Sequence, residues 1–263
     1  MFLWRNGGEL WITYQTDHMT QVGDIGRAWG NEEFLPARRP GAALAGQLHD
    51  EGWAYIDSAP EFDEQTGLPV EYKGYFGSVF GSLKMPAAEY GRGVELLLKM
   101  DKYAALIASL HGTGVYLKDY GIEGTPVPER SSFPPHVQAF LAAEEEMQRR
   151  LRIETGASDE EVWHDFRLFI AWNRLSQIFS RGLQDAWLSK LPTRAMSEGV
   201  KITTKRLDTY TVALEPFPFR SEPQFFPVKT YRLAARSYAS VNDLLCAIAT
   251  TPPISALYTA VAA

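Results

Sequence analysis

The hydrophobic pattern of this chain changes its period near residue 200, and this change restricts the folds that the chain can adopt. In residues 136–154 and 158–190, apolar side chains recur at the spacing of amphipathic helices. After Val200, the segments KITTKRLDTYTVALEPFPF and PVKTYRLAARSYAS alternate between apolar and polar residues, which favours strands. The chain therefore combines a helical part with a later β-rich part.

Turn and cap signals divide the rest of the sequence into elements. Asn6-Gly7-Gly8 stands between two strand-like segments, FLWR and ELWITYQ, and predicts a β-hairpin. Ser158 and Glu161 form a capping-box pattern, which predicts a helix that we expect to reach about Lys190. Further helices are expected from Asp17 as N-cap, over 41–52, 87–98 and 101–111 with Gly112 as a stop, and over 241–249; loops are expected in 54–86 and 117–135.

These elements predict one mainly α domain that spans residues 1–263. A helical core with the N-terminal hairpin would occupy residues 1–195, and a β-rich subdomain would occupy residues 196–263. We expect the hairpin and the late strands to form a small antiparallel sheet on a helical bundle. With 263 residues, 45% of them hydrophobic, the chain can bury a substantial core.

Composition excludes several classes of protein. The net charge is -6, and Lys and Arg are scattered rather than clustered, so nucleic acid is not an expected partner. The single cysteine, Cys246, permits neither an intrachain disulfide nor a cysteine-based zinc site. Because there is neither a signal-peptide pattern nor a run of about 18 apolar residues, we expect a cytoplasmic protein without membrane contact.

Three of the five histidines are predicted to face the interior of the helical part. His18 shares a helix face with Val22, and His49 and His111 each end an apolar helical stripe. A single histidine on such a face is usually a packed core residue. Three of them, with Asp50 directly after His49, favour a divalent metal (Mn, Fe, Zn or Mg), because buried imidazoles and carboxylates are costly unless paired or bound.

His18 followed about thirty residues later by His49-Asp50 resembles the HD superfamily of metal-dependent phosphohydrolases. That resemblance implies a helical bundle whose metal is held by a His, a His-Asp pair and a later Asp. The segments TDHMTQVGDIGRAWG, LHDEGWAYIDSAPEFDEQTGLPV, SLHGTG, AWNRLS and EPFPF resemble more closely an uncharacterised bacterial family of unknown function within or near that architecture. They extend over nearly the whole chain.

The chain departs from the HD pattern at the late acid. Asn173 stands where the resemblance implies a carboxylate, and its amide oxygen can coordinate a hard cation without contributing charge. A weakened or lost metal site is therefore one expectation. Asp165 could substitute only if its helix were placed differently, and His164-Asp165, a second His-Asp pair, is expected on the surface or beside the site.

Further candidates follow from a bound metal. Glu51 and Asp57 could orient or deprotonate a metal-bound water, although both are also explained as loop acids. His111 could be a further ligand, a partner for substrate, or a helix-end histidine. Arg174 could meet an anionic substrate and Trp53 could line its pocket, but a surface ion pair and core packing explain them as well.

The leading hypothesis is a metal-dependent hydrolase of a small anionic, phosphoester-like substrate. The metal ligands would be His18, His49 and Asp50, completed by Asn173 or His111. A second hypothesis is a non-catalytic descendant that binds a small molecule or a protein at a decayed site. A third is an iron oxygenase. The oligomeric state stays open.

Overall fold

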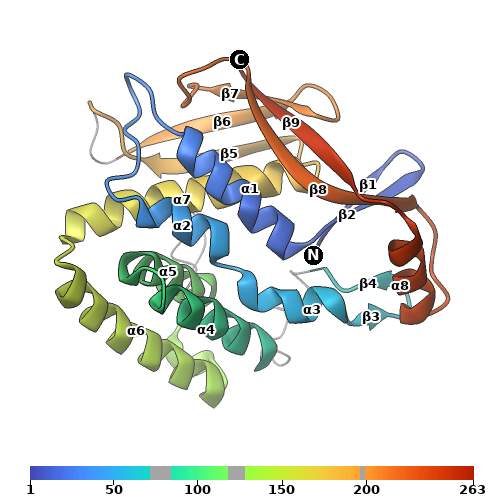
Figure 1. Ribbon diagram of the computed structural model, residues 1–263, viewed down its shortest axis with the longest axis horizontal. Helices are drawn as coiled ribbons and strands as arrows, with labels where there is room; N and C mark the ends of the chain where they lie inside the picture. Colours follow the sequence, from blue (N-terminus) through green and yellow to red (C-terminus); the bar gives the residue numbers. More distant parts are fainter. Residues whose placement is uncertain (72–83, 118–127, 196–198) are drawn as a thin grey trace.

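A curled seven-stranded sheet lies along one side of the molecule, and helices cover its concave face (Figure 1). The computed structural model describes residues 1–71, 84–117, 128–195 and 199–263. Helices account for 48% of the chain and strands for 25%, and the sheet is a mixed half-barrel. The predictions of a mainly α fold and of an HD-like helical bundle are therefore wrong.

The large sheet takes strands from both ends of the chain. Its order is β1-β2-β8-β9-β7-β6-β5, and neighbours are antiparallel except for the parallel pair β7 and β9. The strands are β1 (Phe2–Asn6), β2 (Glu9–Thr13), β5 (Asp185–Leu191), β6 (Val200–Arg206), β7 (Thr211–Glu215), β8 (Gln224–Ala234) and β9 (Ile254–Ala262). A separate small sheet pairs β3 (Phe62–Asp63) with β4 (Leu68–Pro69).

Alternating burial confirms the strands predicted after residue 200. In β8, for example, Phe226, Val228 and Thr230 are buried, whereas the residues between them are exposed. The hairpin of β1 and β2 is confirmed too, with Gly7 at a φ of 60° in its turn. Because the sheet buries one face of each strand, this alternation was readable from the sequence.

The helices follow the predicted pattern more closely at their starts than at their ends. They are α1 (Gln15–Ala28), α2 (Gly41–Leu48), α3 (Ala54–Ser58), α4 (Lys84–Leu98), α5 (Lys102–Leu117), α6 (Pro135–Thr155), α7 (Asp159–Ser180) and α8 (Val241–Thr250), with short 3-10 turns at Glu51–Trp53 and Arg130–Ser132. The Ser158 capping box that starts α7 is confirmed. Parts of the expected loops, residues 72–83 and 118–127, lie outside the described residues.

Two predicted helix ends are wrong for local reasons. The helix expected to reach Lys190 stops at Ser180, because Gly182 has a φ of 61° and a Cβ there would collide with the ring of Trp4. The helix expected to stop at Gly112 continues to Leu117. Gly112 packs closely beneath Tyr90, with only 3.2 Å between an added Cβ and the Tyr90 Cβ, so here glycine serves helix packing rather than termination.

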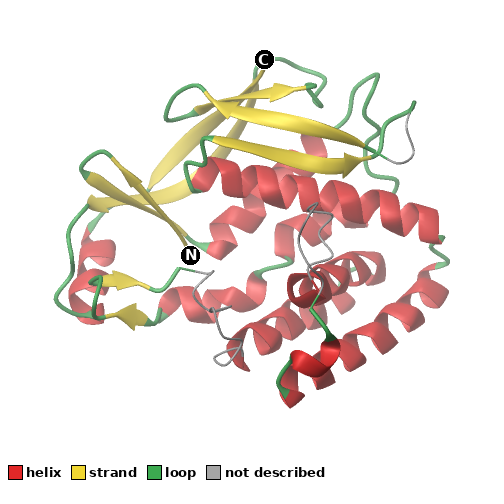
Figure 2. Ribbon diagram, turned by 180° about the vertical axis from the view of Figure 1, so that it is seen from behind, coloured by secondary structure: helices red, strands yellow, loops and turns green. Residues whose placement is uncertain are grey.

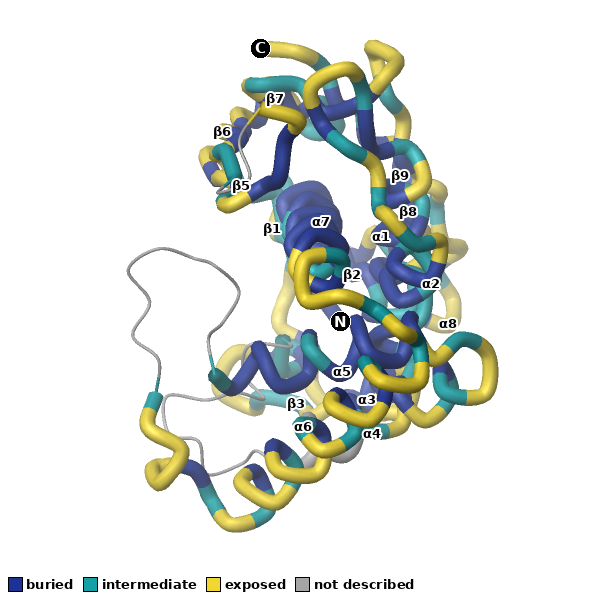
Figure 3. Tube along the Cα trace, turned by 90° about the vertical axis from the view of Figure 1, so that its left-hand side faces the viewer, coloured by how far each residue is buried: buried dark blue, intermediate teal, exposed yellow. Residues whose placement is uncertain are grey.

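Helix α7 lies at the centre of the fold. Seen end on, it is buried within the curl of the sheet, between β5 and the pair β8 and β9 (Figure 3). Helix α1 packs on β8, and α4, α5 and α6 form a further layer on the side away from the sheet (Figures 1 and 2). The face of α7 that does not meet the sheet contacts α1, α2 and α5. Within the described residues, no helix is long and apolar enough to span a membrane.

Arg206 in β6 attaches the end of α7 to the sheet. Its guanidinium donates hydrogen bonds to the carbonyl oxygens of Ile178 at 2.5 Å and Phe179 at 3.2 Å, and to that of Thr209 at 2.8 Å. It also lies over the ring of Trp4. The last carbonyls of a helix have no partner within the helix, and those of Ile178 and Phe179 receive only long backbone hydrogen bonds, from Leu183 and Gly182 at 3.3 Å, so this buried side chain adds strong charged donors to them.

Replacing Arg206 with methionine is expected to lower the free energy of unfolding by about 2–4 kcal/mol, because several buried carbonyl groups lose a charged donor at once. The matched control is Arg232→Met. Arg232 also lies over a tryptophan, Trp11, but its ion pair with Glu9 is well exposed, and its loss should cost less than about 1 kcal/mol. Urea unfolding followed by circular dichroism measures both, and equal losses would contradict the proposed anchoring of α7.

Candidate metal centre

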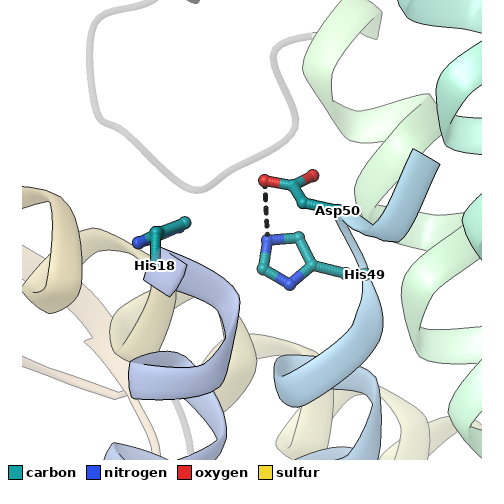
Figure 4. Close-up of side chains that lie close together, drawn as sticks. All are labelled: His18, His49 and Asp50. Carbon is teal, nitrogen blue, oxygen red and sulfur yellow. Dashed lines mark ion pairs between the residues drawn. The ribbon is translucent and has the colours of Figure 1, made fainter. Parts of the chain in front are cut away.

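Two histidines and one aspartate meet in the interior between α1 and the end of α2. His18 belongs to α1, His49 is the residue after α2, and Asp50 follows it before the short turn Glu51–Trp53. One ligand atom from each of the three lies within 4.8 Å of the other two, and all three residues are buried. Figure 4 shows the contact between the His49 ring and the Asp50 carboxylate, with His18 beside them on the neighbouring helix.

Glycines allow α1 and α2 to approach closely enough for this meeting. A Cβ on Gly23 of α1 would lie 2.8 Å from the Cβ of Gln47, and one on Gly46 of α2 would lie 3.1 Å from Cγ1 of Val22. These positions therefore exclude larger side chains unless the helices separate. A third glycine, Gly93 of α4, packs against the backbone carbonyl of His49.

The orientation of His49 leaves one of its nitrogens without a hydrogen-bond partner. Its Nδ1 donates to the carbonyl oxygen of Gly46 at 2.9 Å, so the neutral ring carries its lone pair on Nε2. Nε2 lies 3.2 Å from Oδ2 of Asp50 but is not aligned for a hydrogen bond, and Oδ1 of Asp50 has no hydrogen-bond partner either. In the neutral ring a lone pair thus faces a buried carboxylate, an arrangement that either a proton on Nε2 or a metal ion stabilises.

Charge in this cluster is concentrated on Asp50. Burial opposes ionisation of its carboxyl, but His49 and, more weakly, His111 and His18 outweigh burial and lower the pKa of Asp50 to about 2. Burial, followed by repulsion from His49, lowers the pKa of His18 to about 3 and that of His111 also to about 3. At neutral pH the carboxylate of Asp50 is therefore ionised and the rings of His18 and His111 are neutral, which are the protonation states that bind metal.

Asn173 on α7 completes the immediate surroundings of His18. Its Oδ1 lies 2.8 Å from Nε2 of His18, and it is 6% exposed. The other ring nitrogen of His18, Nδ1, lies 2.6 Å from the hydroxyl of Ser176 on the same helix. The expectation that Asn173 points inward is confirmed, and its amide oxygen adjoins His18, one of the three clustered residues.

The spacing of these groups fits a metal ion. Two ligands at right angles about an ion, each about 2.1 Å from it, lie about 3 Å apart. The pair His18 Nε2 and Asn173 Oδ1 is separated by 2.8 Å, and the pair His49 Nε2 and Asp50 Oδ2 by 3.2 Å. The donor set of two imidazoles, a carboxylate and an amide oxygen suits a divalent ion such as iron, manganese or zinc.

His111 lies beside this cluster on α5. Its ring centroid is 4.9 Å from that of His49 and 5.2 Å from that of Phe169. It is not one of the three residues whose ligand atoms converge. Trp53 is fully buried in a neighbouring apolar cluster with Ile56 and Tyr90, so the structure places it in packed core.

The two acids predicted as catalytic bases occupy different settings. Asp57 is buried, and its carboxylate accepts hydrogen bonds from the Met1 ammonium and from the backbone N–H of Gln15, each at 2.6 Å. Burial raises the pKa of Asp57. Glu51 begins the turn directly after Asp50 and is half-buried. Both oxygens of Asp57 are thus occupied within the fold.

The other candidates lie on α7. Arg174 follows Asn173 and is half-buried. The second His-Asp pair, expected on the surface or beside the site, is buried: the ring of His164 contacts the carbonyl oxygen of Pro36 at 3.0 Å. Asp165 accepts hydrogen bonds from the backbone N–H groups of Arg38 and Arg39 and from the Tyr103 hydroxyl, so it secures the entry to α2 and does not replace Asn173.

Gly93→Ala is expected to destabilise the fold by about 1–3 kcal/mol, because the added Cβ would lie 2.7 Å from the carbonyl oxygen of His49. Gly91→Ala, two residues away on α4, provides the control, since a Cβ there meets nothing within 4 Å. That change should be neutral or stabilising by up to about 1 kcal/mol through helix propensity. Urea unfolding separates them, and equal behaviour of the two variants would contradict the close packing of α4 on His49.

The metal-free protein should lose stability as the pH falls below 6.5. In the unfolded chain, His18 and His111 take up protons near their ordinary pKa of 6.5, whereas in the fold they resist protonation until about pH 3. Each therefore contributes a slope of up to about 1.4 kcal/mol per pH unit between these limits. Urea unfolding of chelator-treated protein at pH 7, 6 and 5 measures the slope. His111→Gln should reduce it, and an unchanged slope in this variant would contradict the assignment.

Comparisons with known proteins identify a family for the chain but assign no function to the site. No curated protein and no solved structure gives a significant match to the chain. The cluster of His18, His49 and Asp50 is compatible with the HD pattern but does not establish membership of that superfamily. A family model matches residues 1–234. The chain therefore belongs to the family described as "Protein of unknown function (DUF3891)".

Proposed function

We propose that His18, His49 and Asp50 bind a divalent metal ion, and that the protein uses this ion to hydrolyse a small anionic substrate of the phosphoester class. The observation that carries the proposal is the convergence of three buried ligand groups within 4.8 Å, two of which expose atoms without hydrogen-bond partners. Buried polar atoms are rarely left unsatisfied, so this cluster is better explained as a site than as core packing.

The charge balance of the ligands supports an anionic substrate. As metal ligands the two imidazoles would be neutral, so only Asp50 among the four groups would be charged, because Asn173 supplies an amide where a second acid would have supplied a carboxylate. With a divalent ion, the site keeps a net charge of about +1, which attracts an anion into the low-dielectric interior. The half-buried Arg174, next to Asn173 in the chain, adds positive charge on the same helix.

A bound divalent ion would lower the pKa of a coordinated water and polarise a phosphoryl oxygen. The chain's own residues would hold the ligands in position: Gly46 orients the His49 ring, and Asp50 supplies the negative charge. Of the two acids considered as general base, Glu51 is favoured. The carboxylate of Asp57 is already engaged by Met1 and Gln15, whereas that of Glu51 has no hydrogen bond within the described part of the chain.

The donor set also supports a second candidate, oxygen chemistry at ferrous iron. Two histidines and one carboxylate that leave further positions open are the ligand set of many non-haem iron oxygenases. His18, His49 and Asp50 supply this combination. Oxygen consumption that requires iron, with no phosphoester hydrolysis, would favour this candidate over the hydrolase.

The metal content of the protein, purified without tag or chelator, tests the proposal first. Mass spectrometry should find near-stoichiometric iron, manganese or zinc in the native protein. His49→Ala and Asp50→Asn should retain much less metal, because the loss of a ligand should weaken metal affinity by at least about tenfold. His136→Ala is the control, because this half-buried histidine at the start of α6 is not part of the cluster. Equal metal content in all variants would refute the site.

Activity measurements then distinguish the hypothesis of a metal-dependent hydrolase from that of a protein that binds metal without catalysis. A panel of small phosphoesters should be hydrolysed by the metal-loaded protein, and both a chelator and Asp50→Asn should abolish turnover. Asn173→Asp probes the missing acid: it should strengthen metal binding, because a carboxylate is a stronger ligand than an amide. Tighter binding with no activity in either form would favour a protein that binds metal without catalysis.

A further inference from the structure

A buried hydrogen-bond chain connects His18 to the sheet. On one side of the ring, Nδ1 lies 2.6 Å from the hydroxyl oxygen of Ser176. That hydroxyl lies 2.6 Å from Oε1 of Gln21, and Nε2 of Gln21 donates to the carbonyl oxygen of Phe226 in β8 at 3.1 Å. His18, Gln21 and Ser176 are fully buried, so water does not supply alternative partners readily.

The donor and acceptor in each of these hydrogen bonds can be assigned by starting from the carbonyl group of Phe226. The carbonyl of Phe226 only accepts, so Gln21 presents its NH₂ group there and its oxygen to Ser176. That oxygen also only accepts, so the single hydroxyl hydrogen of Ser176 is donated to it. Ser176 can then only accept from His18, which requires the hydrogen of the neutral ring to be on Nδ1.

We propose that Gln21 and Ser176 are positioning residues that hold His18 in the Nδ1–H form, so that its Nε2 lone pair is available to a metal. The part of this inference that concerns metal binding rests on the proposed function, whereas the proton position does not. A histidine ligand is commonly fixed in this manner by a hydrogen bond at its other nitrogen. Here the acceptor is a serine whose own hydrogen is committed elsewhere.

Each position of the ring hydrogen leaves one pair of acceptors in contact, and the two pairs differ in what can relieve them. With the hydrogen on Nδ1, the Nε2 lone pair faces Oδ1 of Asn173 at 2.8 Å, a contact that a metal ion between the two atoms, or rotation of the Asn173 amide in the metal-free protein, removes. If the ring hydrogen were on Nε2, it would be donated to Oδ1 of Asn173, and Ser176 would have to donate to Nδ1. Two acceptor oxygens, on Ser176 and Gln21, would then face each other 2.6 Å apart with no hydrogen between them. In a buried setting such a pair is strongly disfavoured.

Helix geometry explains why these residues meet. His18 and Gln21 are three residues apart on α1, and Asn173 and Ser176 are three residues apart on α7, so each pair lies on one helix face. Strand β2 pairs with β8 only at residues 231–234, which leaves the earlier part of β8 without a strand on that side. Gln21 reaches Phe226 in this earlier part, where α1 packs on β8.

Nitrogen NMR of the metal-free protein, labelled with [15N]histidine, tests the inference directly, because the two ring nitrogens report which one carries the hydrogen. In the native protein, Nδ1 of His18 should carry the hydrogen and Nε2 should be unprotonated. Gln21→Met removes the acceptor at similar volume, so the Ser176 hydroxyl becomes free to donate to Nδ1 and His18 should change to the Nε2–H form. Gln21→Glu retains an acceptor oxygen and should keep the native form.

The control lies one turn further along α7. Ser180 is as buried as Ser176, but its hydroxyl has no hydrogen-bond partner among the described residues, so Ser180→Ala should leave the His18 spectrum unchanged. If Gln21→Met fails to fold, Ser176→Ala replaces it, since loss of the acceptor at Nδ1 should also favour Nε2–H. A native His18 that is protonated on Nε2 or on both nitrogens would overturn the inference, as would a folded Gln21→Met variant with the native form.

Titration with Mn²⁺ connects the proton position to the metal. Gln21→Met should bind Mn²⁺ about 10–100-fold more weakly than the native protein, and Gln21→Glu and Ser180→Ala should bind it nearly as well as the native protein. Native protein that has the Nδ1–H form but binds no metal would refute the proposed function while leaving the proton assignment intact. Unchanged Mn²⁺ affinity in a Gln21→Met variant with the Nε2–H form would overturn the positioning role.

Discussion

The burial of Asp50 is the constraint on which the rest of the interior depends. An ionised carboxylate removed from water costs several kcal/mol unless charge or hydrogen bonds offset that cost. Among the described residues, neither lysine nor arginine forms an ion pair with Asp50, and the groups that act on its carboxylate are the imidazoles of His49, His111 and His18. These imidazoles come from α1, from α5 and from the residue that follows α2. The proposed divalent cation at their meeting point would account for the buried carboxylate and the unpartnered His49 nitrogen together.

The sheet contributes to this site although it supplies no ligand. One face of helix α7 lies in the curl of the sheet (Figure 3). Asn173 and Ser176 of the same helix contact His18, so the contacts that hold α7 in place also determine the surroundings of His18. Arg206 holds the end of that helix, and Gln21 joins α1 to β8. The orientation of a ligand on α1 is therefore set by contacts that reach two strands, and the half-barrel acts as the rigid support of the centre.

Short sequence patterns predicted individual helices, turns and strands correctly, whereas the sequence as a whole did not predict the fold class. The capping box at Ser158, the hairpin at Gly7 and the alternating late strands each depend on neighbouring residues, and all three are present in the structure. The fold class was wrong because strand β5 was included in a helix, and because the hairpin and the late strands, which do join one sheet as expected, form a seven-stranded mixed half-barrel rather than a small antiparallel sheet. At the centre, His18, His49 and Asp50 meet as their helix spacing suggested. Gln21 and Ser176 were overlooked, although their three-residue spacing from His18 and Asn173 was a readable signal.

The most direct test of a metal centre is the position of the metal itself. Crystals grown with Mn²⁺ and measured for anomalous scattering should show one strong peak among Nε2 of His18, Nε2 of His49 and the carboxylate of Asp50, about 2.1–2.3 Å from each ligand atom. The same peak should be absent from Asp50→Asn crystals. An empty centre in the native protein, with Mn²⁺ bound only at surface groups or nowhere, would contradict the account.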